Sequence, residues 1–575
     1  MSDALKHECA VSLLRMRRDQ RHFISKYGTP YYALEKMILL LEKQHNRGQD
    51  GAGAAALRLS PEPGKPNYAI QKSAAFTAPL ADLLEKISAR REEFSGDLLL
   101  GHLRYATFGR NDIGNCCPFV HDSSCLNRQL MLAGNFNLTD NRELYERFVA
   151  AGHHPSSTAD GYLLLQTIAH FLEKEVNLNP DAPDYVKILR QSLNTLDGAF
   201  TLCGMTGSGD AFVIRDAHGI RPGFFYFDDE VFAAASERPA IQAAFNRASS
   251  EVMEVPPGKA VIIRRSGEVE IRDCLDPRPR RSCVFERIYF SRANDGEIHR
   301  ERRELGKALV PAVLESVKSD FENTVFSYIP NSAQASFHGM LEQLNADALR
   351  HGRCIRFGQV AVKDAKFRTF ITDSSHRREL YRHVYDVTYG LVRPGSDNLV
   401  VLDDSIVRGN TMRDAILPML DRLGPKKIVV ASSAPPVKYP DCYGIDMATA
   451  GELAAFQAAI AIHRRRGSGI PEEAYQLARA DLAGNHPEKC RNRMKMIYDA
   501  IDENELAAEI AALLTPDDLA ADFTVVYQTC GALRRCCPRH TGDWYFTGDY
   551  PTPGGIRVAN QALVNFFEHN NERAY

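Results

Sequence analysis

The sequence lacks any run of about 18 consecutive apolar residues, and its first residues, MSDALKHE, contain no apolar core. We therefore expect neither membrane insertion nor secretion, and predict a cytoplasmic protein. An excess of charge of one sign is also missing, since 70 basic residues stand against 73 acidic ones. This balance argues against nucleic acid and membrane surfaces as partners. The 13 cysteines are odd in number and scattered, which fits a reducing compartment better than a disulfide framework.

The stretch VVLDDSIVRGNT places two carboxylates between a short apolar run, residues 399–402, and a helical pattern that begins at residues 411–416. Gly409 lets the backbone close around an anion, and the helix N-terminus offers unpaired N–H groups. Asp403 and Asp404 suit sugar hydroxyls, directly or through a divalent cation. The loop therefore predicts a site for a ribose 5-phosphate.

A plain acidic turn, in which Asp404 or Ser405 caps the helix, explains the two carboxylates as well. The full string, however, resembles the 5-phosphoribosyl-1-diphosphate (PRPP) loop of type I phosphoribosyltransferases. The resemblance implies that Asp403 and Asp404 bind the ribose 2′- and 3′-hydroxyls and Mg²⁺. It also implies that the 5′-phosphate is held by Ser405, Ile406, Val407, Arg408, Gly409, Asn410 and Thr411.

The first half of the chain carries different patterns. A helix is expected from Pro30, with apolar residues at helical spacing at Leu34, Met37, Ile38 and Leu41. After it come several apolar segments bounded by Gly and Asp, which predict sheets buried on at least one face: DLLLGHLRYATFG, QLMLAGNFNL, GAFTLCGM, DAFVIRD and EVFAAASE.

These segments, with ECAV, QHNRGQDGAG, STADGYLLL and IRDAHGIRPG, resemble the glutaminase domain of class II glutamine amidotransferases, in its amidophosphoribosyltransferase form. CVFERIYFSR, RRELG, SSAPPVKYPDCYGID and YFTGDYPTP continue the resemblance through the second half. It implies a mixed α/β and α+β fold: an N-terminal-nucleophile αββα sandwich, followed by a transferase domain with a parallel sheet. The expected regions are a propeptide (1–8), the glutaminase (9–280), the transferase (281–450), a helical insertion (451–517) and a C-terminal segment (518–575).

Cys9 matches the nucleophile at the mature N-terminus of this family. A free α-amine accepts the thiol proton, so Cys9 acquires its base only once residues 1–8 are removed. By resemblance, the oxyanion accepts hydrogen bonds from the side-chain amide of Asn135 and from the backbone N–H of Phe136, a position where the family usually has Gly. The alternative for an isolated cysteine is a buried, inert thiol.

Substrate glutamine carries a carboxylate and an ammonium group. Arg104 is predicted to bind the first and Asp160 the second, although either residue taken singly also fits a surface ion pair. Ahead of the phosphate loop, VKDAKFRTFI resembles the family's closing loop and leaves Lys363 and Lys366 as candidate PRPP-binding cations, with two solvated lysines as the alternative. Asn331 and Ala333 replace the usual Asp and Gly of the diphosphate loop.

Some family members hold a [4Fe–4S] cluster on four thiolates. Cys283 and Cys442 match two of these positions, but the segment expected to supply the other pair reads GDWYFTG and contains no cysteine. Cys530, Cys536 and Cys537 lie slightly upstream; they either re-form such a site or are thiols packed near a core. The sequence therefore favours Mg²⁺ as cofactor without a cluster.

The predicted function is that of an amidophosphoribosyltransferase, which converts PRPP, glutamine and water to 5-phosphoribosylamine, glutamate and diphosphate in purine synthesis. The resemblance also implies a homo-oligomer and inhibition by purine nucleotides. Two alternatives stay open: an amidotransferase with another acceptor or poor coupling, and a non-catalytic PRPP- or nucleotide-binding regulator.

Overall fold

The computed structural model describes residues 8–105, 112–363, 385–484, 490–570 and 572–574. The chain divides into two compact units. The N-terminal unit extends to Cys283 and also contains Cys442–Asp446, whereas the C-terminal unit contains Val284–Asp441 and the chain from Met447 onwards. The sequence-based boundaries had placed residues 442–446 with the transferase. In the structure they group with the N-terminal unit, where Asn137 Nδ2 donates to the Cys442 carbonyl at 2.7 Å.

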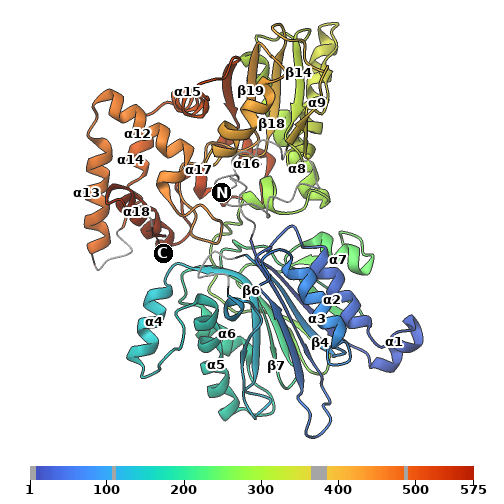
Figure 1. Ribbon diagram of the computed structural model, residues 1–575. Coiled ribbons are helices and arrows are strands. Elements are labelled where there is room, and N and C mark those ends of the chain that lie inside the picture. Colours follow the sequence, from blue (N-terminus) through green and yellow to red (C-terminus); the bar gives the residue numbers. More distant parts are fainter. Residues whose placement is uncertain (1–7, 106–111, 364–384, 485–489, 571, 575) are drawn as a thin grey trace. The chain divides into compact units, whose positions relative to one another are not determined.

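Two antiparallel sheets form the centre of the N-terminal unit (Figure 1). The first has the order β11 (Met253–Glu254), β9 (Phe224–Phe227), β10 (Val231–Ala235), β1 (Ala10–Met16), β4 (Leu98–Arg104), β2 (Gly51–Leu57) and β3 (Tyr68–Ser73). The second has the order β13 (Val269–Asp273), β12 (Lys259–Ile263), β8 (Ala211–Arg215), β7 (Gly198–Thr206), β6 (Leu130–Leu138) and β5 (Phe119–His121).

Helices cover the outer face of each sheet. One core joins the first sheet to α2 (Tyr32–Glu42), α3 (Pro79–Ala89) and α7 (Arg238–Phe245). A second core lies between the two sheets and extends to α5 (Asp160–Leu178) and α6 (Tyr185–Leu193). The layers are therefore α, β, β and α, as the sequence predicts. The remaining helices of this unit are α1 (Gln20–Tyr27), η1 (Ile113–Asn115) and α4 (Asn141–Ala150).

A parallel sheet forms the centre of the C-terminal unit, in the order β15 (Arg356–Phe357), β14 (Thr324–Tyr328), β18 (Asn398–Asp403), β19 (Lys427–Ser432) and β20 (Asp522–Tyr527). Its core packs one face of β14, β18 and β19 against α8 (Gly296–Ser316) and α9 (Gln334–Arg350). A separate two-stranded sheet pairs β16 (Ala361–Lys363) with β17 (Tyr385–Val387).

The rest of the C-terminal unit is mainly helical (Figure 1). Its short helices are η2 (Glu286–Phe290), η3 (Met412–Ile416), α11 (Leu417–Asp421) and η4 (Ala450–Glu452), and the C-terminal ones are α16 (Cys530–Cys536), α17 (Trp544–Thr547) and α18 (Pro553–Phe567). The predicted insertion contains α12 (Ala454–Arg466), α13 (Ile470–Ala483), α14 (Lys495–Asp499) and α15 (Glu503–Leu514). None of the helices in the described part of the chain combines the length and apolar character that crossing a membrane requires.

Candidate active sites

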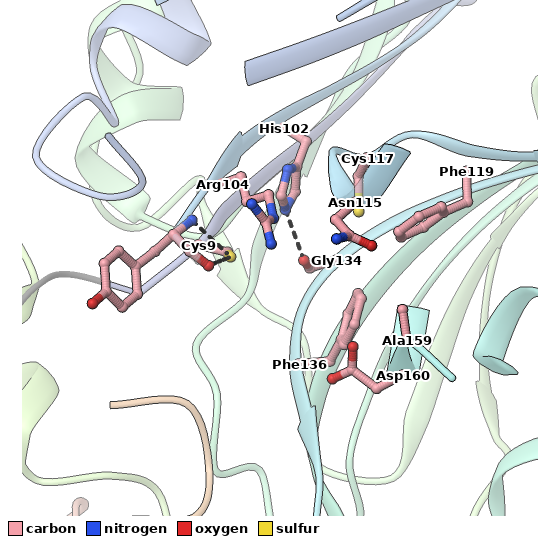
Figure 2. A pocket seen from close by; sticks show the side chains of 11 residues that line it. Cys9, His102, Arg104, Asn115, Cys117, Phe119, Gly134, Phe136, Ala159 and Asp160 are labelled. Atoms are coloured by element: carbon pink, nitrogen blue, oxygen red, sulfur yellow. Dashed lines mark hydrogen bonds between the residues drawn. The ribbon is translucent and has the colours of Figure 1, made fainter. Parts of the chain in front are cut away.

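A pocket in the N-terminal unit brings together four of the predicted site residues (Figure 2). Cys9 directly precedes β1, Arg104 is the last residue of β4, Phe136 lies in β6 and Asp160 is the first residue of α5. His102, Tyr105, Asn115, Cys117, Phe119, Gly134 and Ala159 complete its lining. Residues from both sheets and the first residue of α5 therefore line one cavity.

The thiol of Cys9 is held by the backbone of the residue that follows β4. Tyr105 donates its N–H to Cys9 Sγ at 3.3 Å, and Sγ contacts the Tyr105 carbonyl at 3.6 Å (Figure 2). Burial raises the pKa of the Cys9 thiol to about 11, against smaller opposing effects from Tyr105 and Arg104. With Glu8 still attached, Cys9 is therefore a neutral thiol at physiological pH.

Asp160 and His102 are two further titratable side chains of the pocket whose pKa values are shifted. Burial raises the pKa of Asp160 to about 6, although the Gly161 N–H, at 2.8 Å, and Arg104 favour the carboxylate. Asp160 is thus ionised at neutral pH and available to an ammonium group. Burial lowers the pKa of His102 to about 3, so its ring is neutral; its Nε2 lies 3.0 Å from the Gly134 carbonyl.

Asn135, between two pocket residues of β6, points to the opposite face of the strand. There its Nδ2 donates to the carboxylate of Glu8 at 3.2 Å. The Asn135 amide, the predicted oxyanion donor, therefore binds the residue directly before the nucleophile. Its N–H group donates to Glu8, the last residue of the predicted propeptide. The two predicted oxyanion residues are thus placed differently: the Phe136 side chain enters the pocket, whereas that of Asn135 faces Glu8.

The carboxylate of Glu8 lies in a buried charge network that was not predicted from the sequence. Arg47 Nη1 lies 3.3 Å from Glu8, Arg221 forms a second ion pair with it, and none of these three side chains is exposed to solvent. Arg47 Nε also donates to Glu237 at 2.7 Å, as does the side chain of Asn46, the extra residue in QHNRGQDGAG. Both arginines stand in motifs that match the family, but only the fold shows that their charges meet.

The phosphate loop leaves β18 at the carboxyl end of the parallel sheet, where ligands bind in open α/β folds. Residues 404–409 connect β18 to helical turns that begin at Asn410 and continue into η3, so a strand and a helix flank the loop as predicted. Gly409 has φ +81°, a left-handed conformation that a side chain disfavours. The predicted phosphate-binding residues are therefore contiguous on one strand-to-helix loop.

The two adjacent carboxylates are poorly solvated. Burial, together with the charge of Asp404, raises the pKa of Asp403 well above its usual range. Burial also raises the pKa of Asp404, against hydrogen bonds from Ser332 and from Ser405, the latter at 3.1 Å. Ser332 belongs to the candidate diphosphate loop after β14, so the loops of two neighbouring strands meet here. One half-buried carboxylate, Asp403, and one buried carboxylate, Asp404, suit ribose hydroxyls and an oxygen-binding cation.

Several predicted residues stay untested by this geometry. Lys366 lies outside the described residues, and only the backbone of Lys363, in β16, is described. Asn331 and Ala333 lie in the turn between β14 and α9. Cys283 and Cys442 are both buried in the N-terminal unit. Within the described residues, no three His, Cys, Asp or Glu side chains gather as a metal site.

Part of the N-terminal unit is similar to a known domain, and most of the chain is similar to named enzymes. Residues 117–243 match a glutamine amidotransferase domain. The amidophosphoribosyltransferase of Pasteurella multocida is 29% identical over 72% of this chain and 78% of its own length, and that of Archaeoglobus fulgidus is 30% identical over 63% and 74%.

The fold resembles that of the Bacillus subtilis glutamine PRPP amidotransferase solved with ADP and GMP, with a TM-score of 0.67, 24% identity, and coverage of 95% of this chain and 97% of the other. The sequence relatives extend across both units, and the curated enzymes among them share one name. The chain therefore belongs to the amidophosphoribosyltransferase family.

Proposed function

We propose that the chain hydrolyses glutamine in the N-terminal unit and uses the ammonia in the C-terminal unit to convert PRPP to 5-phosphoribosylamine, glutamate and diphosphate. The observation that carries this proposal is the presence, in one chain, of the Cys9 pocket and the loop from Asp403 to Thr411. Neither site alone accounts for the reaction, since one releases ammonia and the other binds an activated ribose phosphate.

In the glutaminase half, Cys9 Sγ attacks the side-chain amide carbon of glutamine, and the thiol proton passes to the Cys9 α-amine. Ammonia leaves, the glutamyl group stays on sulfur as a thioester, and water then releases glutamate. Arg104 binds the substrate carboxylate and Asp160 its ammonium group. The Asn135 amide and the Phe136 N–H stabilise the oxyanion.

This chemistry requires the bond between Glu8 and Cys9 to be cut first. Glu8 occupies the Asn135 amide, and its peptide link removes the α-amine that would act as base. The raised pKa of the Cys9 thiol in the linked form supports the same conclusion. We therefore assign residues 1–8 as a propeptide that keeps the glutamine site latent.

In the transferase half, residues 405–411 hold the 5′-phosphate, Asp403 and Asp404 orient the ribose hydroxyls, and Lys363 contributes a cation to PRPP binding. Ammonia forms the new C–N bond at ribose C1 as the bond to diphosphate breaks. Mg²⁺ held near Asp403 and Asp404 would neutralise charge on the diphosphate. The donor set fits this ion, because both groups are oxygen ligands.

An iron–sulfur cluster does not fit the donor set. Besides Cys283 and Cys442, two more thiolates are needed, and the matching segment instead contributes the buried side chain of Trp544, whose Nε1–H donates to Asp441 at 3.1 Å. We propose that the enzyme works without a cluster. We further propose a cytoplasmic homo-oligomer that purine nucleotides inhibit, as the family and the nucleotides bound to its solved relative suggest.

The test measures glutamate and diphosphate release from glutamine, PRPP and Mg²⁺, with intact mass recorded to establish whether residues 1–8 remain. The proposal predicts that both products form and that PRPP increases glutamate release. Equal glutamate release with and without PRPP, and no diphosphate, would favour an amidotransferase with another acceptor. PRPP binding without either product would identify a regulator.

A further inference from the structure

The helical insertion contacts three consecutive residues of the phosphate loop, all within the C-terminal unit. At its start, the N–H of Ala454, the first residue of α12, donates to the Val407 carbonyl at 2.9 Å. Just before it, Glu452 accepts from Arg408 Nε at 2.9 Å. The insertion therefore touches the loop at its backbone and at a side chain.

The third contact comes from the other end of the insertion. A Cβ built on Gly409 would lie 2.2 Å from Cδ2 of Leu514, the last residue of α15, so the Leu514 side chain packs directly against the Gly409 backbone. Leu514 is 3% exposed, whereas its neighbour Leu513 is 37% exposed. One side of the loop is thus closed by a single apolar side chain that lies over 100 residues away along the chain.

The two helices that make these contacts are joined to each other. Along their exposed edges, Arg465 donates to Glu509 at 2.7 Å and Arg466 donates to Glu505 at 2.5 Å. Leu506, Ile510 and Leu514 follow one another at helical spacing and are all buried. A displacement of α15 would therefore move Leu514 and, through α12, the contacts of Ala454 and Glu452.

Precise placement of the loop matters because phosphate is bound largely by backbone N–H groups, whose directions follow the backbone. A loop with a left-handed glycine has no regular backbone hydrogen bonds that fix the directions of its N–H groups. Neighbouring helices must therefore hold its backbone in place. We propose that α12 and α15 are the support that positions the 5′-phosphate loop, with Leu514 as the main positioning residue. This inference rests on the proposed function, since it assigns the loop to PRPP.

The test compares Leu514→Ala with Leu506→Ala, which removes the same atoms from the same buried face of α15, and with Leu513→Ala on its exposed face. We expect Leu514→Ala to raise the KM for PRPP on the order of tenfold while kcat changes less than about twofold. Leu514→Met, which keeps the volume, should fall close to the wild type. Thermal unfolding of each variant checks that stability losses are matched.

Two fragments of the substrate locate the effect. Titration calorimetry with ribose 5-phosphate should show the same weakening in Leu514→Ala as the KM does, whereas the Kd of Mg²⁺-pyrophosphate should stay constant. If Leu506→Ala weakens ribose 5-phosphate equally, or if pyrophosphate binding falls as much, Leu514 acts through general stability and the inference is wrong.

The same binding assay separates the two proposals. A wild-type protein that binds ribose 5-phosphate but releases no diphosphate from PRPP would contradict the proposed function, and the variants would still test the support of the loop. A wild-type protein with full turnover and a Leu514→Ala variant with unchanged ribose 5-phosphate binding would overturn the inference alone.

Discussion

The two candidate sites are built by different physical means. In the N-terminal unit, residues from two antiparallel sheets form the pocket. Beside it, two buried arginines form ion pairs with the carboxylate of Glu8. In the C-terminal unit, a loop at the end of a parallel strand offers backbone donors, and apolar packing from α15 closes one side of it. In our proposal, the first site requires cleavage of the Glu8–Cys9 bond, whereas the second depends on the position of its neighbouring helices.

The largest expected effect is that of Cys9→Ala, which should abolish the glutaminase activity and leave the transferase activity intact. Cys9→Ala should lower glutamate release by about 10³-fold or more, since it removes the nucleophile. Diphosphate release with ammonium chloride in place of glutamine should stay within about twofold, because the phosphate loop is untouched. Paired product assays measure both rates, and Cys125→Ala, at an exposed cysteine, is the control. A parallel loss of the ammonia-dependent rate would show that the sites are not separable in this way.

The buried charges of the N-terminal unit should make Glu8 important for the stability of the precursor. In a Cys9→Ala background, in which mass spectrometry confirms that Glu8 is retained, Glu8→Gln should lower the free energy of unfolding by about 3–5 kcal/mol. Arg221 and Arg47 each lose a buried ion-pair partner, although Arg47 keeps its pair with Glu237. Urea denaturation measures this change.

An exposed ion pair provides the control for that experiment. Glu93→Gln breaks a pair with Arg90 in which both side chains are well exposed, and it should leave the midpoint of urea denaturation nearly unchanged. Similar effects of the two substitutions would mean that Glu8 is not held as the structure shows.

Removal of divalent cations should affect only the second site. With EDTA in excess, PRPP-dependent diphosphate release is expected to fall about 10²-fold or more, since several kcal/mol of charge neutralisation are lost. Basal glutamate release without PRPP should not change, because the Cys9 pocket needs no metal for its chemistry. Re-addition of Mg²⁺ is the control. A basal rate of glutamate release that also requires Mg²⁺ would contradict the prediction that only the second site depends on the cation.

The smallest effect concerns pH. Asp160 has a pKa of about 6, so its carboxyl group is charged above that pH and neutral below it. As pH falls through 6, the substrate ammonium loses its partner, and kcat/KM for glutamine should fall by up to about tenfold per pH unit. Asp160→Asn should be weaker at neutral pH but lack this dependence. An Asp160→Asn profile that keeps the same inflection would assign the titration to another group.

Much of the fold could be predicted from local pattern. The apolar segment of residues 399–402 lies in β18, and the helical spacing after Pro30 corresponds to α2, with Leu34, Met37 and Leu41 buried. Such elements are readable because periodicity and flanking Gly or Pro act over a few residues. Periodicity could not group residues 442–446 with the N-terminal unit, because their contacts with it, such as the Asn137–Cys442 hydrogen bond, join residues some 300 positions apart.

The sequence by itself determined the residue types of both sites, the order of the two units and the strand-to-helix loop, because these are properties of short contiguous segments. Only the tertiary structure decided that Glu8 engages Asn135 and two buried arginines, and that Leu514 packs against Gly409. Contacts of this kind join side chains far apart in the chain. Their existence depends on how whole elements pack, which no local pattern specifies.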